Sequence, residues 1–157
     1  MLLWKDGLVD LVQVIDAAMS DAVRKSGDWI ACRAGCFECC IGPFEITQLD
    51  AQRLRDGLAV LDPERAARVR RRAREYAGGD DEACPALDPE AGTCDLYDAR
   101  PLTCRVFGPA VRSHGGIGAC ELCYVGASDG EIAACAVELD LSVLEDEHET
   151  TVAMALK

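Results

Sequence analysis

The ten cysteines of this 157-residue chain are the residues whose type and spacing could do chemistry. Two C-x-x-C pairs have the two-residue spacer that lets both sulfurs reach one metal ion or one cluster. Glycine and proline flank the cysteines and favour the turns that such ligands need. Nine cysteines fall into three sets, which are Cys32, Cys36, Cys39 and Cys40, then Cys84, Cys94 and Cys104, then Cys120 and Cys123. The spacing predicts a metal centre held by thiolates.

The adjacent pair Cys39-Cys40 bears on the number of sites. Consecutive side chains leave the backbone in different directions, so two neighbours seldom ligate one tetrahedral metal. Either the two thiols serve neighbouring sites, or one ligates and the other lies behind it. Eight or nine candidate thiolates allow two four-sulfur sites. One site with additional structural or redox cysteines is equally compatible with the sequence.

The expected cellular compartment decides between metal ligation and disulfides. The segment Met1–Asp6 lacks the basic start and the apolar stretch of a secretory signal, and no apolar run approaches the ~18–20 residues that span a bilayer. We therefore expect a cytoplasmic protein without a membrane partner. Stable disulfides are uncommon in a reducing cytosol, where clustered cysteines are more often metal ligands or redox groups.

The net charge of −12 argues against a nucleic-acid partner, because such binding requires neutralisation of phosphates. A redox or other protein partner is the remaining expectation. Arginine is concentrated in one run, which we interpret as a solvated helix face. A phosphate-binding face and a docking face for the acidic C-terminal third are alternatives. The run consists of Arg65, Arg68, Arg70, Arg71, Arg72 and Arg74.

The pattern around the cysteines predicts helices joined by loops. Residues 8–25 carry one apolar stripe at three- and four-residue steps, formed by Leu8, Leu11, Val12, Ile15, Met19 and Val23. Thr47 can cap a second helix, and Asp62-Pro63 can start a third that runs to Tyr76. Between 80 and 118 repeated glycine and proline allow only short strands or turns. A final helix, or a strand and helix, begins near Gly130.

The order of these motifs resembles that of the CxxCxxCC-type cysteine-cluster family, commonly described as zinc- or iron-chelating and often labelled iron–sulfur oxidoreductases. The resemblance rests on Cys32-x3-Cys36-x2-Cys39-Cys40, on Cys84-Pro85-Ala86-Leu87, and on Cys94-Asp-Leu-Tyr97-x2-Arg100-Pro101-x2-Cys104-Arg105. The first spacer is three residues here, where the family usually has two. The resemblance implies that the ligands are Cys32, Cys36, Cys39, Cys40, Cys84, Cys94, Cys104 and Cys120.

The remaining candidates each have a plainer interpretation. Cys123 lies outside the pattern of the family but completes a C-x-x-C pair, so we include it among the ligands. Cys135 stands in an apolar stretch, where free cysteine usually behaves as a small buried hydrophobe. His114 and His148 are expected to be solvated. Three arginines flank ligand candidates, namely Arg33, Arg100 and Arg105. Their positive charge either lowers the pKa values of neighbouring thiols, or they are merely solvated surface groups.

Together these observations predict a mainly α, small, irregular single domain over residues 1–157, organised by its metal, with loop-rich cysteine segments and room for a short β-hairpin. We expect this domain to have three parts, which are an N-terminal helix at 8–25, a metal-binding core at 32–123 and an acidic C-terminal segment at 130–157. The favoured function is an iron–sulfur or iron protein in electron transfer or redox chemistry, with a 4Fe–4S cluster as one form. A zinc-binding structural module and a thiol redox switch are alternatives. No motif for a catalytic residue emerges.

Overall fold

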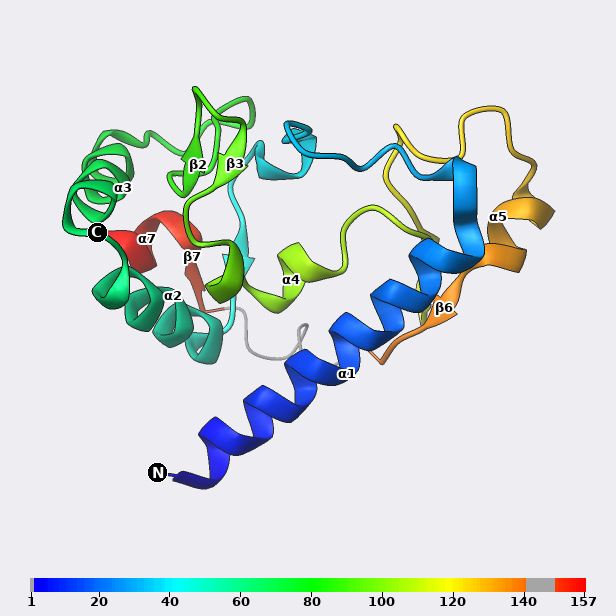
Figure 1. Ribbon diagram of the computed structural model, residues 1–157, viewed down its shortest axis with the longest axis horizontal. Coiled ribbons are helices and arrows are strands. Elements are labelled where there is room, and N and C mark those ends of the chain that lie inside the picture. Colours follow the sequence, from blue (N-terminus) through cyan, green and yellow to red (C-terminus); the bar gives the residue numbers. More distant parts are fainter. Residues whose placement is uncertain (1, 141–148) are drawn as a thin grey trace. The chain divides into compact units, whose positions relative to one another are not determined.

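A computed structural model describes residues 2–140 and 149–157. The chain forms two compact units, which we describe separately. The described part of the first unit consists of residues 2–32 and 102–140, and that of the second consists of residues 33–101 and 149–157. Figure 1 traces the elements of both. The chain is 48% helical, with a few short strands in small sheets, which confirms the predicted fold class.

The first unit is built around its long N-terminal helix. It contains α1 (Leu2–Ser26), η1 (Gly27–Trp29), α4 (Leu102–Arg105), β4 (Val111–Ser113), β5 (Gly116–Gly118), α5 (Asp129–Cys135) and β6 (Val137–Glu138). Strand β4 pairs antiparallel with β5 and parallel with β6. Helix α1 contacts α4, α5 and β6. The helix predicted at 8–25 therefore lies within α1, and α5 confirms the helix expected near Gly130.

The buried face of α1 differs from the predicted stripe at one position. Ile15, Met19 and Ala22 are buried, whereas Val23 is 46% exposed. Ser26 continues the buried row, at four residues from Ala22. The buried face therefore continues through Ala22 and Ser26, and the more hydrophobic Val23 lies outside it.

The second unit contains two capped helices, a short C-terminal helix, one hairpin and a pair of strands that are distant in sequence. Its elements are η2 (Glu38–Cys40), β1 (Glu45–Ile46), α2 (Gln48–Val60), α3 (Pro63–Glu75), β2 (Leu87–Asp88), β3 (Thr93–Cys94), η3 (Tyr97–Ala99), β7 (Thr150–Thr151) and α7 (Val152–Leu156). Strands β2 and β3 form the hairpin, and β1 pairs with β7. Both predicted caps are present. The Thr47 hydroxyl accepts a bond from the amide of Asp50, and the Asp62 carboxylate accepts one from the amide of Arg65.

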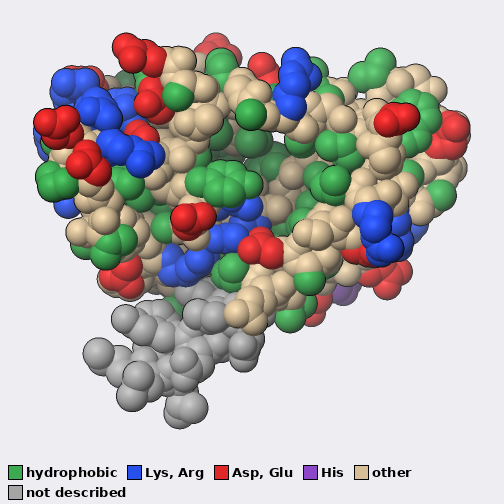
Figure 2. All heavy atoms as spheres, in the orientation of Figure 1, with side chains coloured by type: hydrophobic (Ala, Val, Ile, Leu, Met, Phe, Trp, Pro, Cys, Tyr) green, Lys and Arg blue, Asp and Glu red, His purple; other side chains and the backbone are tan. Residues whose placement is uncertain are grey.

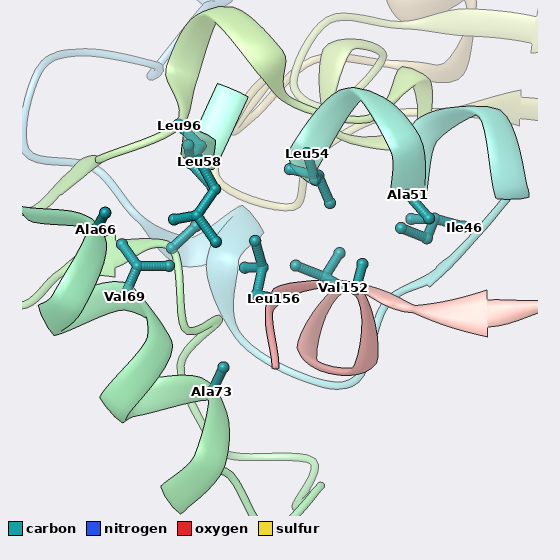
Figure 3. Packing of buried hydrophobic residues seen from close by; sticks show 12 residues of the cluster. Ile46, Ala51, Leu54, Leu58, Ala66, Val69, Ala73, Leu96, Val152 and Leu156 are labelled. Carbon is teal, nitrogen blue, oxygen red and sulfur yellow. The ribbon is translucent and has the colours of Figure 1, made fainter. Parts of the chain in front are cut away.

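The core of the second unit lies where α2 and α3 meet α7 (Figure 3). Leu54, Val69 and Leu156 are almost fully buried in it and come from these three helices. Cys84 and Cys94 pack against the edge of this core. The core therefore supports two of the predicted ligands directly.

The predicted acidic segment at 130–157 is only partly described. It includes α5, β6, β7 and α7, whereas residues 141–148, with His148, lie outside the described residues. Among the residues that were searched, no helix combines the length and apolarity needed to cross a membrane.

Candidate metal centre

Backbone pairing brings two cysteine segments of the second unit together. Ile41 forms an antiparallel bridge with Ala83, and the Gly42 amide donates to the carbonyl of Glu82 at 2.8 Å. The Cys84 amide donates to the carbonyl of Cys40 at 2.6 Å. Cys40 and Cys84, which are distant in sequence, are therefore cross-strand neighbours.

The hairpin formed by β2 and β3 adds a third segment. Leu87 pairs with Cys94, and the Leu87 amide also donates to the carbonyl of Cys84 at 2.9 Å. Near the hairpin turn, a Cβ on Gly92 would lie 3.3 Å from the Cα and the carbonyl oxygen of Gly35, which precedes Cys36. Gly92 also has a φ of +66°, so both its conformation and this close approach favour glycine.

The thiols of Cys39 and Cys40 form one hydrogen-bonded pair. The bond from Cys40 lowers the pKa of Cys39 to about 6, with a smaller contribution from the positive charge of Arg100. The same bond, together with burial, raises the pKa of Cys40. Negative charge on Cys84 and Cys94 contributes to that rise. The pair therefore contains one thiol that ionises readily and one that keeps its proton, within electrostatic reach of two further thiols.

Burial is the main cause of the pKa shifts of the other two thiols of this group, those of Cys84 and Cys94. It raises the pKa of Cys84 to about 11 and also raises the pKa of Cys94. Arg100 opposes the rise at Cys94 and stacks on the ring of Tyr97, with its guanidinium carbon 3.7 Å from the ring centroid. Arg100 thus fulfils the expectation that a basic neighbour lowers thiol pKa values in this cluster.

The arginine run on α3 is not wholly solvated, which corrects our interpretation. Arg65 and Arg72 form ion pairs with Asp95, whose carboxylate is buried. Figure 2 shows basic side chains, mixed with acidic ones, gathered over α3. The other members of the run, Arg68, Arg70, Arg71 and Arg74, are exposed, and Arg65 is exposed as well despite its ion pair. The composition of the run could not distinguish the two kinds of arginine, because their partner lies on a distant loop.

In the first unit, Gly108 connects two other predicted ligands. A Cβ on Gly108 would lie 2.7 Å from the Sγ of Cys32, and the carbonyl of Gly108 accepts a bond from the Cys120 amide at 3.0 Å. Gly108 has a φ of +107°. Cys32 and Cys120 therefore both contact Gly108, and the contact with Cys32 requires that Gly108 has no side chain.

Tyr124 fixes the turn that contains Cys120 and Cys123. Its buried hydroxyl accepts a bond from the Ala110 amide at 2.8 Å and is bonded to Ser26 Oγ at 2.7 Å. Its amide donates to the carbonyl of Trp29. Tyr124 also adopts a φ of 59°, a conformation that is uncommon for a bulky residue. Nothing in the sequence distinguished Tyr124 or Asp95 as residues that position ligands.

The last cysteines differ in their surroundings. Cys123 is buried, and its Sγ accepts a bond from the Ala31 amide at 3.4 Å. Cys135 is buried in the same apolar cluster, and its Sγ donates to the carbonyl of Lys25, which confirms its interpretation as a small buried hydrophobe. Cys104 lies on α4 and is partly buried.

Arg105, next to Cys104, holds α4 against α1. Its Nη1 lies 3.0 and 2.8 Å from the two carboxylate oxygens of Asp16, and the arginine itself is buried. The suggestion that Arg105 is merely solvated was therefore wrong. Its guanidinium instead connects two helices of the first unit.

The donor set of the second unit fits a thiophilic metal. Cys36, Cys39, Cys40, Cys84 and Cys94 offer only sulfur, and no histidine occurs between residues 33 and 101. Within the described residues, no three His, Cys, Asp or Glu side chains are arranged so that they would hold a metal ion. The five cysteine sulfurs suit a thiophilic metal in their chemistry, and they lie on neighbouring segments of the second unit. Metal binding would draw them together, as is common for such sites.

A family model, CxxCxxCC, matches residues 31–124 under the description "Putative zinc- or iron-chelating domain". The chain belongs to this family. The match spans well over half of the chain, includes Cys123 and leaves out Cys135. No curated protein and no solved structure matched the chain. The family's description, chelation of zinc or iron, agrees with the metal-binding cysteine cluster predicted from spacing.

Proposed function

We propose that this CxxCxxCC domain holds iron, most simply as an iron–sulfur cluster, through cysteine thiolates and acts in electron transfer. The observation that carries the proposal is the all-sulfur donor set on neighbouring segments of the second unit. Iron–sulfur clusters are held by cysteine thiolates in this way. Such a cluster, when bound, supplies one-electron redox chemistry.

The residues of the second unit have distinct roles in this proposal. Cys36, Cys39, Cys40, Cys84 and Cys94 are the proposed ligands. Cys84 and Cys94 pack against the apolar core, which keeps water away from one side of the site. Cys39 is exposed, which leaves the other side open to an electron partner. The positive charge of Arg100 offsets part of the negative charge that several thiolates bring.

The remaining proposed ligands belong to the first unit. They are Cys32, Cys104, Cys120 and Cys123, and their assignment comes from the family motif and the second C-x-x-C pair. The approach of Cys32 and Cys120 to Gly108 supports a shared site for these two. The hydrogen bond that Cys123 Sγ accepts is compatible with either a thiol or a ligating thiolate.

A structural zinc site is the second candidate. Its supporting observation is the contact of Cys84 and Cys94 with the core, since structural zinc sites are closed and contribute directly to folding. In that case the domain would bind a partner through its surface. For both candidates we propose a protein partner, because the net charge of −12 disfavours nucleic acid.

The test is elemental analysis, acid-labile sulfide and a visible spectrum of protein purified without oxygen. Iron with sulfide and broad visible absorption is the expected result, whereas colourless protein with stoichiometric zinc would select the second candidate. Cys84→Ser should lose the metal. Cys135→Ala is the matched control and should retain it, because Cys135 lies outside the family match. Equal metal content in both variants, or none in the wild type, would contradict thiolate ligation.

A further inference from the structure

Asp95 directly follows Cys94, and its carboxylate is held by two arginines of α3. Arg65 donates from Nε and Nη2 to Oδ1, at 3.1 and 2.9 Å. Arg72 donates from Nη2 to Oδ2 at 2.6 Å. Asp95 is only 7% exposed, so these charge-assisted bonds are largely shielded from water and restrict the position of the loop.

Arg72 connects the same carboxylate to the other cysteine segment. Its Nε donates to the carbonyl of Pro85 at 2.8 Å, and Pro85 follows Cys84. The Asp95 amide in turn donates to the carbonyl of Ala86 at 2.8 Å. The residues after Cys84 and Cys94 are thus joined to each other and to a single helix by side-chain and backbone bonds.

We propose that Asp95 and Arg72, assisted by Arg65, are positioning residues that set the spacing of the Cys84 and Cys94 thiols for metal binding. The inference rests on the proposed thiolate site. Removing the Arg72 guanidinium frees both ligand segments from α3 side-chain bonds made by that residue, because it bonds each of them. Neutralising Asp95 weakens the attachment of the Cys94 segment alone. Residues that orient ligands in this manner typically change metal affinity by 10- to 100-fold.

An additional argument concerns charge. Arg72, which is bonded to the residue after Cys84, opposes the rise in the pKa of Cys84. The carboxylate of Asp95 instead adds to the rise in the pKa of Cys94, so the positive charge acts at Cys84. A buried ion pair contributes little to stability compared with a well-packed apolar group, so a purely structural requirement would not favour this arrangement. A guanidinium that both bonds the segment after Cys84 and offsets the charge of that ligand does favour it.

The experiment compares adjacent arginines of α3 in the full chain. Zn²⁺ serves as the probe, since it binds thiolates without redox chemistry whichever metal is resident. Zinc-loaded wild type, Asp95→Asn, Arg72→Gln and the control Arg71→Gln are titrated with a chromophoric chelator. We expect Zn²⁺ affinity to fall about 10- to 100-fold in Asp95→Asn and Arg72→Gln. In Arg71→Gln it should change by less than about two-fold, because Arg71 is exposed.

A second measurement separates positioning from general destabilisation. Arg72→Lys keeps the charge but cannot bond Asp95 and Pro85 together, so it should stay folded and still bind Zn²⁺ more weakly than the wild type. The ligand-field spectrum of the Co²⁺-loaded protein should also change in Arg72→Lys, since it reports the arrangement of the sulfurs. Wild-type affinity and an unchanged spectrum in these variants would overturn the inference. A wild type that takes up no Zn²⁺ would instead contradict the thiolate site itself.

Discussion

The amide nitrogen of Cys84 lies 2.6 Å from the carbonyl oxygen of Cys40. This bond between backbone atoms joins two cysteine segments. A second backbone bond of the ladder, from the Gly42 amide to the Glu82 carbonyl, lies next to it. Metal binding to the proposed site would therefore start from backbone that is already paired. This pairing fixes the relative register of the Cys40 and Cys84 segments.

Amide hydrogen exchange in the metal-free protein should reveal this ladder. We expect the amides of Gly42 and Cys84 to exchange much more slowly than that of Ala83, which takes no part in the two bonds. Residue-specific exchange measured by NMR checks this. Equal exchange at Cys84 and Ala83 would show that the pairing does not persist without metal.

Alkylation of metal-free protein should identify Cys39 as an unusually acidic thiol. Its pKa of about 6 lies below the ordinary value of about 8.5, so its rate of reaction with iodoacetamide should rise as the pH passes through 6. Since folding lowers this pKa, the thiolate stabilises the fold above about pH 8.5, and that contribution is lost as the pH falls through 6. Mass spectrometry of the peptide measures the profile.

The cause of the shift can be tested with Cys40→Ala. Removal of the hydrogen bond from Cys40 should move the midpoint of Cys39 alkylation up toward about pH 8.5. Cys135→Ala, which changes a thiol of the first unit, should leave the midpoint near 6. A midpoint unaffected by Cys40→Ala would assign the lowered pKa of Cys39 to the backbone bond at Cys39 and to Arg100 instead.

Gly108→Ala should destabilise the first unit. The added methyl would lie 2.7 Å from Cys32 Sγ, and the φ of +107° is strained for any other residue. We expect the free energy of unfolding to fall by about 1–3 kcal/mol, measured by denaturation with urea. Gly118→Ala is the control, because nothing lies within 4 Å of its Cβ position. An equal effect of the two substitutions would contradict this close approach.

Tyr124→Phe should also destabilise the chain, through a different mechanism. It leaves the buried Ala110 amide and Ser26 hydroxyl without the phenolic oxygen that they contact, at a cost of about 1–3 kcal/mol. Tyr97→Phe removes a hydroxyl from a side chain that is 61% exposed and should change stability by less than about 0.5 kcal/mol. Thermal unfolding of both variants compares them. Similar transition temperatures would show that the Tyr124 hydroxyl is dispensable.

The helices were predictable because their signals are local. Thr47 and Asp62 cap α2 and α3 through bonds to residues three positions ahead, and this spacing is visible in the sequence. The cysteine spacing likewise indicated a family whose match covers residues 31–124. Where a signal depends on residues that are close in sequence, the prediction succeeded.

The supports of the site could not be predicted, because they depend on residues far apart in sequence. Asp95 meets Arg65 and Arg72 only after the β2–β3 hairpin turns back toward α3. Val23 resembled a core residue, yet Ala22 occupies the buried position because of its neighbours in the fold. The charge or hydrophobicity of one residue does not specify which distant residue it contacts, and that contact determines whether the residue is buried, paired or solvated.

Helix α7 completes the core of the second unit, and this has a consequence for biosynthesis. The ribosome adds Leu156 about sixty residues after Cys94. At ~5–20 residues per second, the thiols of this unit exist for several seconds before the last core helix is available. During translation the nascent chain therefore presents Cys84 and Cys94 without their full apolar support. Delivery of the metal once α7 has joined the core would avoid capture of a competing ion by these early thiols.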